Sequence, residues 1–236
     1  MFKVGLQIEI TTFVNCIQYA IYNMITQESL KSQIIKALWQ LIIDGKILPN
    51  EPMREIQLTE LLNISRTPLR DALQQLEWEG IVVSEPRKGY RLAQFSEDDI
   101  LEIYPLRAKL ESFALELSDV PNKKVLEELI EINSKILNSK SPKEIVELDE
   151  SWHILLISNC PNHRLLKMIK TLHRQSQRYE YAYMAMNQTV EKSSNQHENI
   201  ILQLQKGELQ KATELLAANN LVGMDALVNW LKSENK

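Results

Sequence analysis

An aspartate and a histidine lie one helical turn apart in the stretch Asp149-Glu150-Ser151-Trp152-His153. If this stretch is helical, Asp149 and His153 share a face, and a carboxylate oxygen and an imidazole nitrogen can bind one divalent ion. By itself the pair is weak evidence, because most such pairs are only surface neighbours. Another histidine, His197, lies between the polar run EKSSNQ and the apolar run ENIILQL. That position is more typical of a structural histidine than of a ligand.

A second chemically informative stretch is SRTPLRDALQQLEWEG, which begins at Ser65. Ser65 can cap a helix here, and Pro68 falls in the first turn, where proline is tolerated. Arg66 and Arg70 then share a face near the helix N-terminus, the end that enters the major groove in helix-turn-helix proteins. Arginine suits a bidentate contact with guanine O6 and N7, whereas Thr67 and Ser65 suit phosphate. The alternative is an ordinary amphipathic helix with a solvated charged face.

The elements around this helix favour DNA binding. Apolar residues recur at helical spacing over 28–44, a short helix is expected over 55–62, and the arginine-bearing helix runs from Ser65 to Glu79. The segments IVVSEP and YRLAQF, joined by a turn at Arg87-Lys88-Gly89, are typical of a β-hairpin. Three helices followed by a two-stranded hairpin predict a winged helix-turn-helix, and the agreement between these elements weakens the alternative.

The rest of the chain predicts helices only. A capping box with acids in the first turn begins at Ser96. The expected helices are 97–118, 122–138, 142–159, 162–187, 191–206 and 208–232, with breaks at Pro121, Pro142, Pro161 and Gly207. The predicted fold class is therefore mainly α: a winged helix-turn-helix with a small β-hairpin wing over 24–95, and an all-α antiparallel helical bundle over 96–236.

The composition indicates a protein of the reducing cytoplasm. The chain has two cysteines among 236 residues, too few for a disulfide framework, and no apolar run is long enough for a membrane span. The net charge of −4 argues mildly against DNA binding, but Lys+Arg and Asp+Glu are balanced, nine against nine, over 28–95. The excess acid lies in the second domain.

Residues 1–23 differ from the rest of the chain. Gln7 and Glu9 interrupt their apolar stretch, and no clear cleavage site follows, which argues against a signal peptide. We expect a dispensable extension, with Met24 as a sensible true start.

The stretches SRTPLRDALQQLEWEGIV and EDDILEIYPLRAKLES, with a glycine-tipped wing between them, resemble the GntR family of bacterial regulators. Within it, they resemble the subgroup with a FadR-like ligand domain. The resemblance implies a homodimer that binds a palindromic operator and releases DNA or changes how it binds DNA when a metabolite binds. It also implies that Arg66, Thr67 and Arg70 contact DNA from the recognition helix. Lys88 and Gly89 would approach the minor groove from the wing.

One departure concerns the residue just before the second helix. Many family members carry a basic residue where this chain has Ile56, and Arg54 lies two positions away. The resemblance leaves one DNA contact in question there.

The resemblance also implies a metal site. Family members with a metal use an aspartate and a histidine one turn apart, a second histidine about four dozen residues later, and a third on the last helix. Asp149, His153 and His197 match, and Asn219 takes the fourth position, with Asn220 beside it. Asparagine offers only a carbonyl oxygen to a zinc-like ion. We expect a zinc- or nickel-type ion to be held weakly, or the effector to bind without a metal.

Two arginines are candidates for binding a small organic acid. Arg107 matches an arginine common in the family, and an inward-facing guanidinium needs an anion such as an effector carboxylate. A salt bridge to Glu111, one turn away, is an equal alternative. Arg178, beside three tyrosines in the longest expected helix, is expected to reach the same cavity. His163 and His173 are interpreted as surface residues.

The leading hypothesis is a ligand-responsive repressor or activator of transcription, and a repressor is favoured. A metal-dependent enzyme is a second hypothesis, but no general base stands out and a DNA-binding domain would be unexplained. A third is an architectural DNA-binding protein with an unliganded bundle, which would need neither Arg107 nor the metal-type residues.

Overall fold

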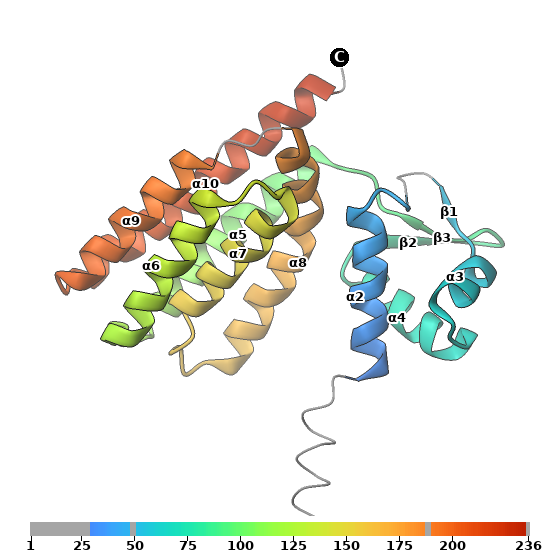
Figure 1. Ribbon diagram of the computed structural model, residues 1–236, viewed down its shortest axis with the longest axis horizontal. Helices are drawn as coiled ribbons and strands as arrows, with labels where there is room; N and C mark the ends of the chain where they lie inside the picture. The colour runs from blue at the N-terminus through green and yellow to red at the C-terminus, as the bar shows by residue number, and fades with distance from the viewer. Residues whose placement is uncertain (1–28, 48–50, 187–189, 235–236) are drawn as a thin grey trace, which may run out of the picture.

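The structure is a computed structural model that describes residues 29–47, 51–186 and 190–234. The extension predicted over 1–23, and Met24, lie outside these residues. An N-terminal domain of helices and a small sheet lies beside a C-terminal helical bundle, and a short linker joins them (Figure 1). The predicted fold class is confirmed.

The N-terminal domain buries its apolar residues between its three helices and the sheet. Its elements are α2 (Leu30–Ile43), β1 (Pro52–Met53), α3 (Glu55–Leu62), α4 (Arg66–Trp78), β2 (Val82–Glu85) and β3 (Gly89–Leu92). On α4 the residues Leu69, Ala72, Leu73 and Leu76 are fully buried, as the helical spacing requires. Ser65 occupies the N-cap position, but its side chain makes no capping hydrogen bond.

The sheet has one strand more than the predicted hairpin. The strand order is β1-β3-β2, with both pairs antiparallel. Arg91 lies opposite Pro52 in β1 and opposite Val83 in β2. Pro52 can belong to β1 because an edge strand tolerates proline.

The bundle contains the six predicted helices within a few residues of their expected ends. They are α5 (Glu97–Glu116), α6 (Lys123–Asn138), α7 (Pro142–Leu156), α8 (His163–Met186), α9 (Glu191–Gln205) and α10 (Leu209–Glu234). Ser96 caps α5 as expected, because its hydroxyl accepts a hydrogen bond from the Asp99 amide. Most buried apolar side chains from α5 to α10, among them Trp152 and Leu216, form one cluster, and a second cluster around Tyr179 and Leu227 joins α5, α8 and α10.

Helix α8 touches the N-terminal domain through two arginines one turn apart. Arg174 Nη1 lies 3.1 Å from Oε1 of Glu79, a residue at the end of α4 that is only 1% exposed. Arg178 donates to the linker carbonyl of Ala93 at 3.0 Å and to Asp99 at 2.7 Å. The junction is therefore held by two charged contacts, one to the buried carboxylate of Glu79 and one to Asp99, whose side chain is 45% exposed.

Replacing Arg174 with alanine should destabilise this junction. Glu79 would keep a buried carboxylate without its cation, which costs about 1–3 kcal/mol in the free energy of unfolding. Urea denaturation followed by circular dichroism measures the loss. Arg164→Ala is the matched control, since Arg164 lies exposed on the same helix. Equal stability of the two variants would show that the Arg174 contact contributes nothing.

Candidate functional site

The residues predicted to contact DNA lie together on one exposed surface of the N-terminal domain. Ser65, Arg66, Thr67 and Arg70 are all exposed at the N-terminal end of α4. The opposite face of this helix is buried in the domain core. The side chains that could contact bases are therefore free to do so without unfolding any part of the domain.

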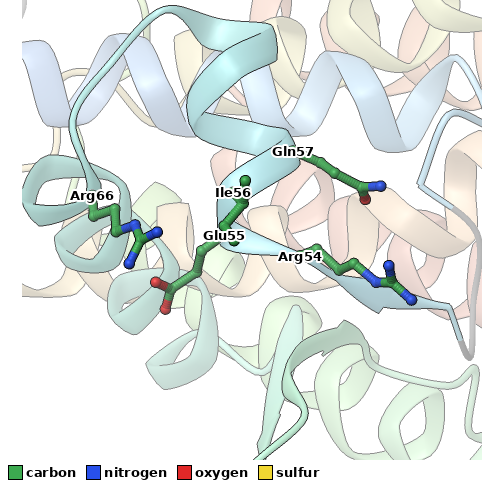
Figure 2. A pocket seen from close by; sticks show the side chains of 5 residues that line it. All are labelled: Arg54, Glu55, Ile56, Gln57 and Arg66. Atoms are coloured by element: carbon green, nitrogen blue, oxygen red, sulfur yellow. The ribbon is translucent and has the colours of Figure 1, made fainter.

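A hollow beside α4 changes the interpretation of Ile56. Its lining is Arg54, Glu55, Ile56, Gln57 and Arg66. Arg54 directly precedes α3, which begins at Glu55. Figure 2 shows Arg54 and Arg66 on either side of Glu55 and Ile56. Arg54 is therefore a basic residue immediately before the second helix, two positions earlier in the chain than the position where many family members carry one.

The wing presents Lys88 and Gly89 at the tip between β2 and β3. Lys88 is exposed, 3.7 Å from Glu85 Oε2. Gly89 has a φ of +88°, a conformation that other residues rarely adopt, and a Cβ there would meet the Met53 carbonyl at 3.6 Å. Glycine is therefore required by the turn itself, whatever the wing contacts.

The bundle contains an open cavity of about 370 Å³ that is lined by residues of all six helices, α5 to α10. Its polar lining includes Tyr104, Arg107, Asp149, His153, Glu180 and Asn219. Asp149 Oδ2 lies 3.8 Å from His153 Nε2, and Asp149 Oδ1 lies 3.7 Å from His197 Nε2. The structure thus brings together the three residues that the resemblance singled out, with their ligand atoms within 4.8 Å of one another.

The other nitrogen of each histidine is held by a fixed acceptor. His153 Nδ1 donates to Glu111 Oε2 at 2.7 Å, and His197 Nδ1 donates to Asn133 Oδ1 at 3.1 Å. These bonds leave the Nε2 lone pairs facing Asp149, the arrangement usual around metal-bound imidazole. The buried Nε2 of His197 has no hydrogen-bond partner in the described part of the chain. The site therefore fits a divalent ion, which would act there as a Lewis acid that binds carboxylate.

The pKa shifts of the three groups follow from their burial. Burial lowers the pKa of His197 well below its usual value, so this imidazole stays neutral. Burial also acts to lower the pKa of His153, but the Glu111 carboxylate outweighs it and raises that pKa. Burial raises the pKa of Asp149. A proton on His153 therefore competes with an ion.

Asn219 lies at the site but is already engaged. Its side chain is 7% exposed, and its Nδ2 donates to Gln196 Oε1 at 3.0 Å. The neighbouring Asn220 donates to Glu111 Oε2 at 3.2 Å. Asn219 therefore lines the same cavity as Asp149 and His153 with its amide nitrogen already bonded, while Asn220 supports Glu111.

Arg107 is 3% exposed and already has two carboxylate partners. Its Nε donates to Glu111 Oε1 at 3.2 Å, which confirms the salt bridge weighed as an alternative. Its Nη1 donates to Glu180 Oε1 at 2.7 Å. An effector carboxylate is therefore not needed to neutralise Arg107, although Arg107 does line the cavity.

Two expectations about α8 are wrong. Arg178 does not line the cavity, because its guanidinium is bound at the domain junction. His173 is not a surface residue: it is 1% exposed, and its Nε2 lies 2.9 Å from Glu111 Oε1. Burial lowers the pKa of His173 to about 4. His163 is exposed, as expected.

Sequence reasoning missed Glu180 and Asn133 and gave Glu111 only one of its partners. A signal for His173 was present, since positions 165, 169, 173, 176 and 180 form one stripe along α8. Its first two residues, Leu165 and Ile169, are buried, so the stripe indicated that His173 and Glu180 face inward. Nothing in the spacing indicated Asn133.

Comparison with known sequences agrees with this architecture. The profile of the bacterial regulatory proteins of the gntR family matches residues 30–92, and that of the FCD domain matches residues 102–219, half of the chain. YdhC, an HTH-type transcriptional regulator of Bacillus subtilis, is 30% identical over 58% of this chain and 64% of its own length. The repressor GlaR of Escherichia coli is 27% identical over 74% of this chain and 85% of its own.

Solved structures share the fold. McbR/YncC of E. coli superposes with a TM-score of 0.73 at 19% identity, covering 87% of this chain and all of that one. A putative GntR regulator from Rhodococcus gives 0.73 at 18% identity, covering 86% and 99%. The chain belongs to the gntR family of bacterial regulatory proteins and carries an FCD domain. These relatives are regulators and not enzymes, which decides against the metalloenzyme hypothesis. None of the described helices is both long and apolar enough to cross a membrane.

Restoring an imidazole at position 219 should strengthen metal binding. We expect Asn219→His to raise the affinity for zinc or nickel at least about tenfold, and His153→Ala to lower it. Affinity should fall as the pH is lowered, because protonation of His153 removes its lone pair. Calorimetry on chelator-treated protein measures all three effects.

The exposed His163 provides the control, as His163→Ala should leave the affinity unchanged. If Asn219→His brings no gain and His153→Ala no loss, the cavity is not a metal site.

Proposed function

We propose that this protein represses transcription by binding a palindromic operator as a homodimer, and that a small organic acid bound in the bundle cavity changes its grip on DNA. A zinc- or nickel-type ion at Asp149, His153 and His197 takes part in binding the acid. DNA as the target places the protein in the cytoplasm. Repression is the activity of the relative GlaR, which supports this choice over activation.

The exposed N-terminal end of α4 is the observation that carries DNA binding. Arg66 and Arg70 project from the side opposite the buried face, at the end that enters the major groove in this class of domain. Arg54 adds a further cation on the opposite side of the same hollow from Arg66. A domain of balanced charge binds phosphate when its cations gather on one surface, as here.

Exposed apolar side chains on α5 support the homodimer. Leu106, Phe113 and Leu117 are 51%, 47% and 39% exposed, and α5 packs beside α10, where Leu221 is 38% exposed. Apolar residues gathered on a surface are typical of a contact between proteins. A second copy of the chain fits here, because a twofold dimer would present two recognition helices to a palindrome.

The charges in the cavity support binding of the ion before the acid. The charged residues that line it are Arg107, Lys192, Asp149, Glu180 and Asp225, and the buried Glu111 is paired with Arg107, so carboxylates outnumber cations. An organic acid that entered alone would add negative charge to this excess, which is costly at low solvent exposure. A divalent ion offsets the excess and leaves a coordination position for a carboxylate.

Helix α8 supports a route from the cavity to DNA. His173 and Glu180 face the buried charges, whereas Arg174 and Arg178 bind the N-terminal domain and the linker. A ligand that moves or rotates α8 therefore acts on both sets of contacts. Such an element, biased by both sites, is what coupling between ligand and DNA requires.

Replacing Arg70 with alanine should weaken operator binding without unfolding the protein. Each lost base contact costs about 1–3 kcal/mol of discrimination, and a dimer loses two. Selection from random duplex DNA supplies the operator, and a gel-shift titration at fixed salt measures affinity. Arg164→Ala is the control, because Arg164 is an exposed arginine of the bundle, on α8 and outside the proposed DNA-binding surface. Unchanged affinity for Arg70→Ala would remove this residue from the interface.

Charge on the apolar surface of α5 should prevent dimer formation. Phe113→Glu places carboxylates of two chains in an apolar contact, so we expect monomers in light scattering and weaker operator binding. Glu116→Gln, an exposed position on the same helix, should remain dimeric. A Phe113→Glu variant that stays dimeric would locate the dimer elsewhere.

A further inference from the structure

Glu55, the first residue of α3, contacts Arg70 of α4. Arg70 Nε lies 3.0 and 2.9 Å from the two carboxylate oxygens of Glu55. The Glu55 side chain is 20% exposed and that of Arg70 is 58% exposed. The acid therefore lies beneath, and the guanidinium projects outward. A carboxylate in the first turn of a helix is also stabilised by the helix dipole, so α3 itself favours charge at this position.

The Glu55 carboxylate accepts hydrogen bonds from Nε of the Arg70 guanidinium and none from its two terminal nitrogens. Within residues 29–47, 51–186 and 190–234, the hydrogen bonds of Arg70 run through Nε alone. Its two terminal nitrogens form the planar fork that matches O6 and N7 of guanine. A long arginine side chain otherwise samples many rotamers, several of which would direct the fork to phosphate. A carboxylate hydrogen-bonded to Nε reduces the number of rotamers that Arg70 samples.

We propose that Glu55 is a positioning residue that sets sequence specificity: it holds Arg70 so that the terminal nitrogens face a base edge and not the phosphate backbone. The inference rests on the proposed DNA binding. Glu55 has a second effect, because its negative charge lies close to the surface that meets DNA. This charge lowers affinity for any duplex, since phosphates repel it. Glu55 therefore lowers the affinity for DNA of any sequence and raises the discrimination between sequences.

The test compares four full-length variants with the wild type in selection from random duplex DNA, followed by competition between the selected operator and a scrambled duplex. Glu55→Ala removes the contact, Glu55→Gln keeps one acceptor without charge, and Arg70→Ala removes the fork. Glu60→Ala is the charge control, because Glu60 is exposed on the same helix and has no ion pair within the described residues. Thermal melting checks that every variant is folded.

We expect Glu55→Ala to lower the preference for operator over scrambled DNA by about tenfold, the scale of one bidentate base contact. Its affinity for scrambled DNA should rise as in Glu60→Ala, which keeps its operator preference. The selected pools of Glu55→Ala and Arg70→Ala should lose the same base position, and Glu55→Gln should fall between Glu55→Ala and the wild type.

Three results would overturn the inference: a Glu55→Ala pool with an unchanged consensus, a loss at a base position different from that of Arg70→Ala, or a change identical to that of Glu60→Ala. If the wild type itself enriches no sequence, the proposed DNA binding fails, a result that is distinct from all three.

Discussion

The carboxylate of Glu111 has no solvent exposure, and much of the bundle is arranged around its charge. Removing a carboxylate from water costs several kcal/mol unless partners surround it. Burial alone would raise the pKa of Glu111, but His153, His173 and Arg107 outweigh that effect and lower it well below its usual value. With Asn220 as a further donor, the partners come from four helices, so α5, α7, α8 and α10 must converge on this point.

This one charge also prepares the cavity for its ligands. The bond from His153 fixes the imidazole tautomer and turns Nε2 toward Asp149. The bond from Arg107, together with that to Glu180, neutralises the guanidinium before any effector arrives. In the proposed function, the site therefore suits a divalent ion better than a free organic acid, and the acid binds through the ion. The Glu111 carboxylate also contacts His173, and the next residue of α8, Arg174, binds the N-terminal domain.

The fold of the N-terminal domain was predictable because its signals are local. Helical spacing, the glycine after α4 and the basic turn at Gly89 each specify structure within a few residues, and their agreement specified the domain. The third strand was missed because its two residues pair with Arg91 and Tyr90, which are far along the chain. The sequence signals of the bundle helices were equally local. The spacing of Asp149 and His153 by one helical turn, together with the family resemblance, predicted the grouping of these two residues with His197.

The partners of these residues were not predictable from spacing. Glu111 meets His153 across 42 positions of sequence, and Asn133 meets His197 across 64. Such contacts depend on how helices pack, which no periodicity specifies. Arg178 illustrates the same limit: its helix was expected correctly, but the face it occupies turns to the linker and away from the cavity. The ion pair of Arg174 with Glu79 joins two domains and was invisible for the same reason.

In the proposed function the cavity controls DNA binding, and the ion is a required part of the signal. The most direct test is fluorescence anisotropy of labelled operator with chelator-treated protein, titrated with an organic acid chosen by thermal-shift screening, with and without zinc. We expect the acid to change operator affinity at least about tenfold when zinc is present, the scale of a typical coupling free energy, and not when it is absent. His153→Ala should abolish the response. An equal response without zinc, or in His153→Ala, would show that the ion takes no part in the control of DNA binding.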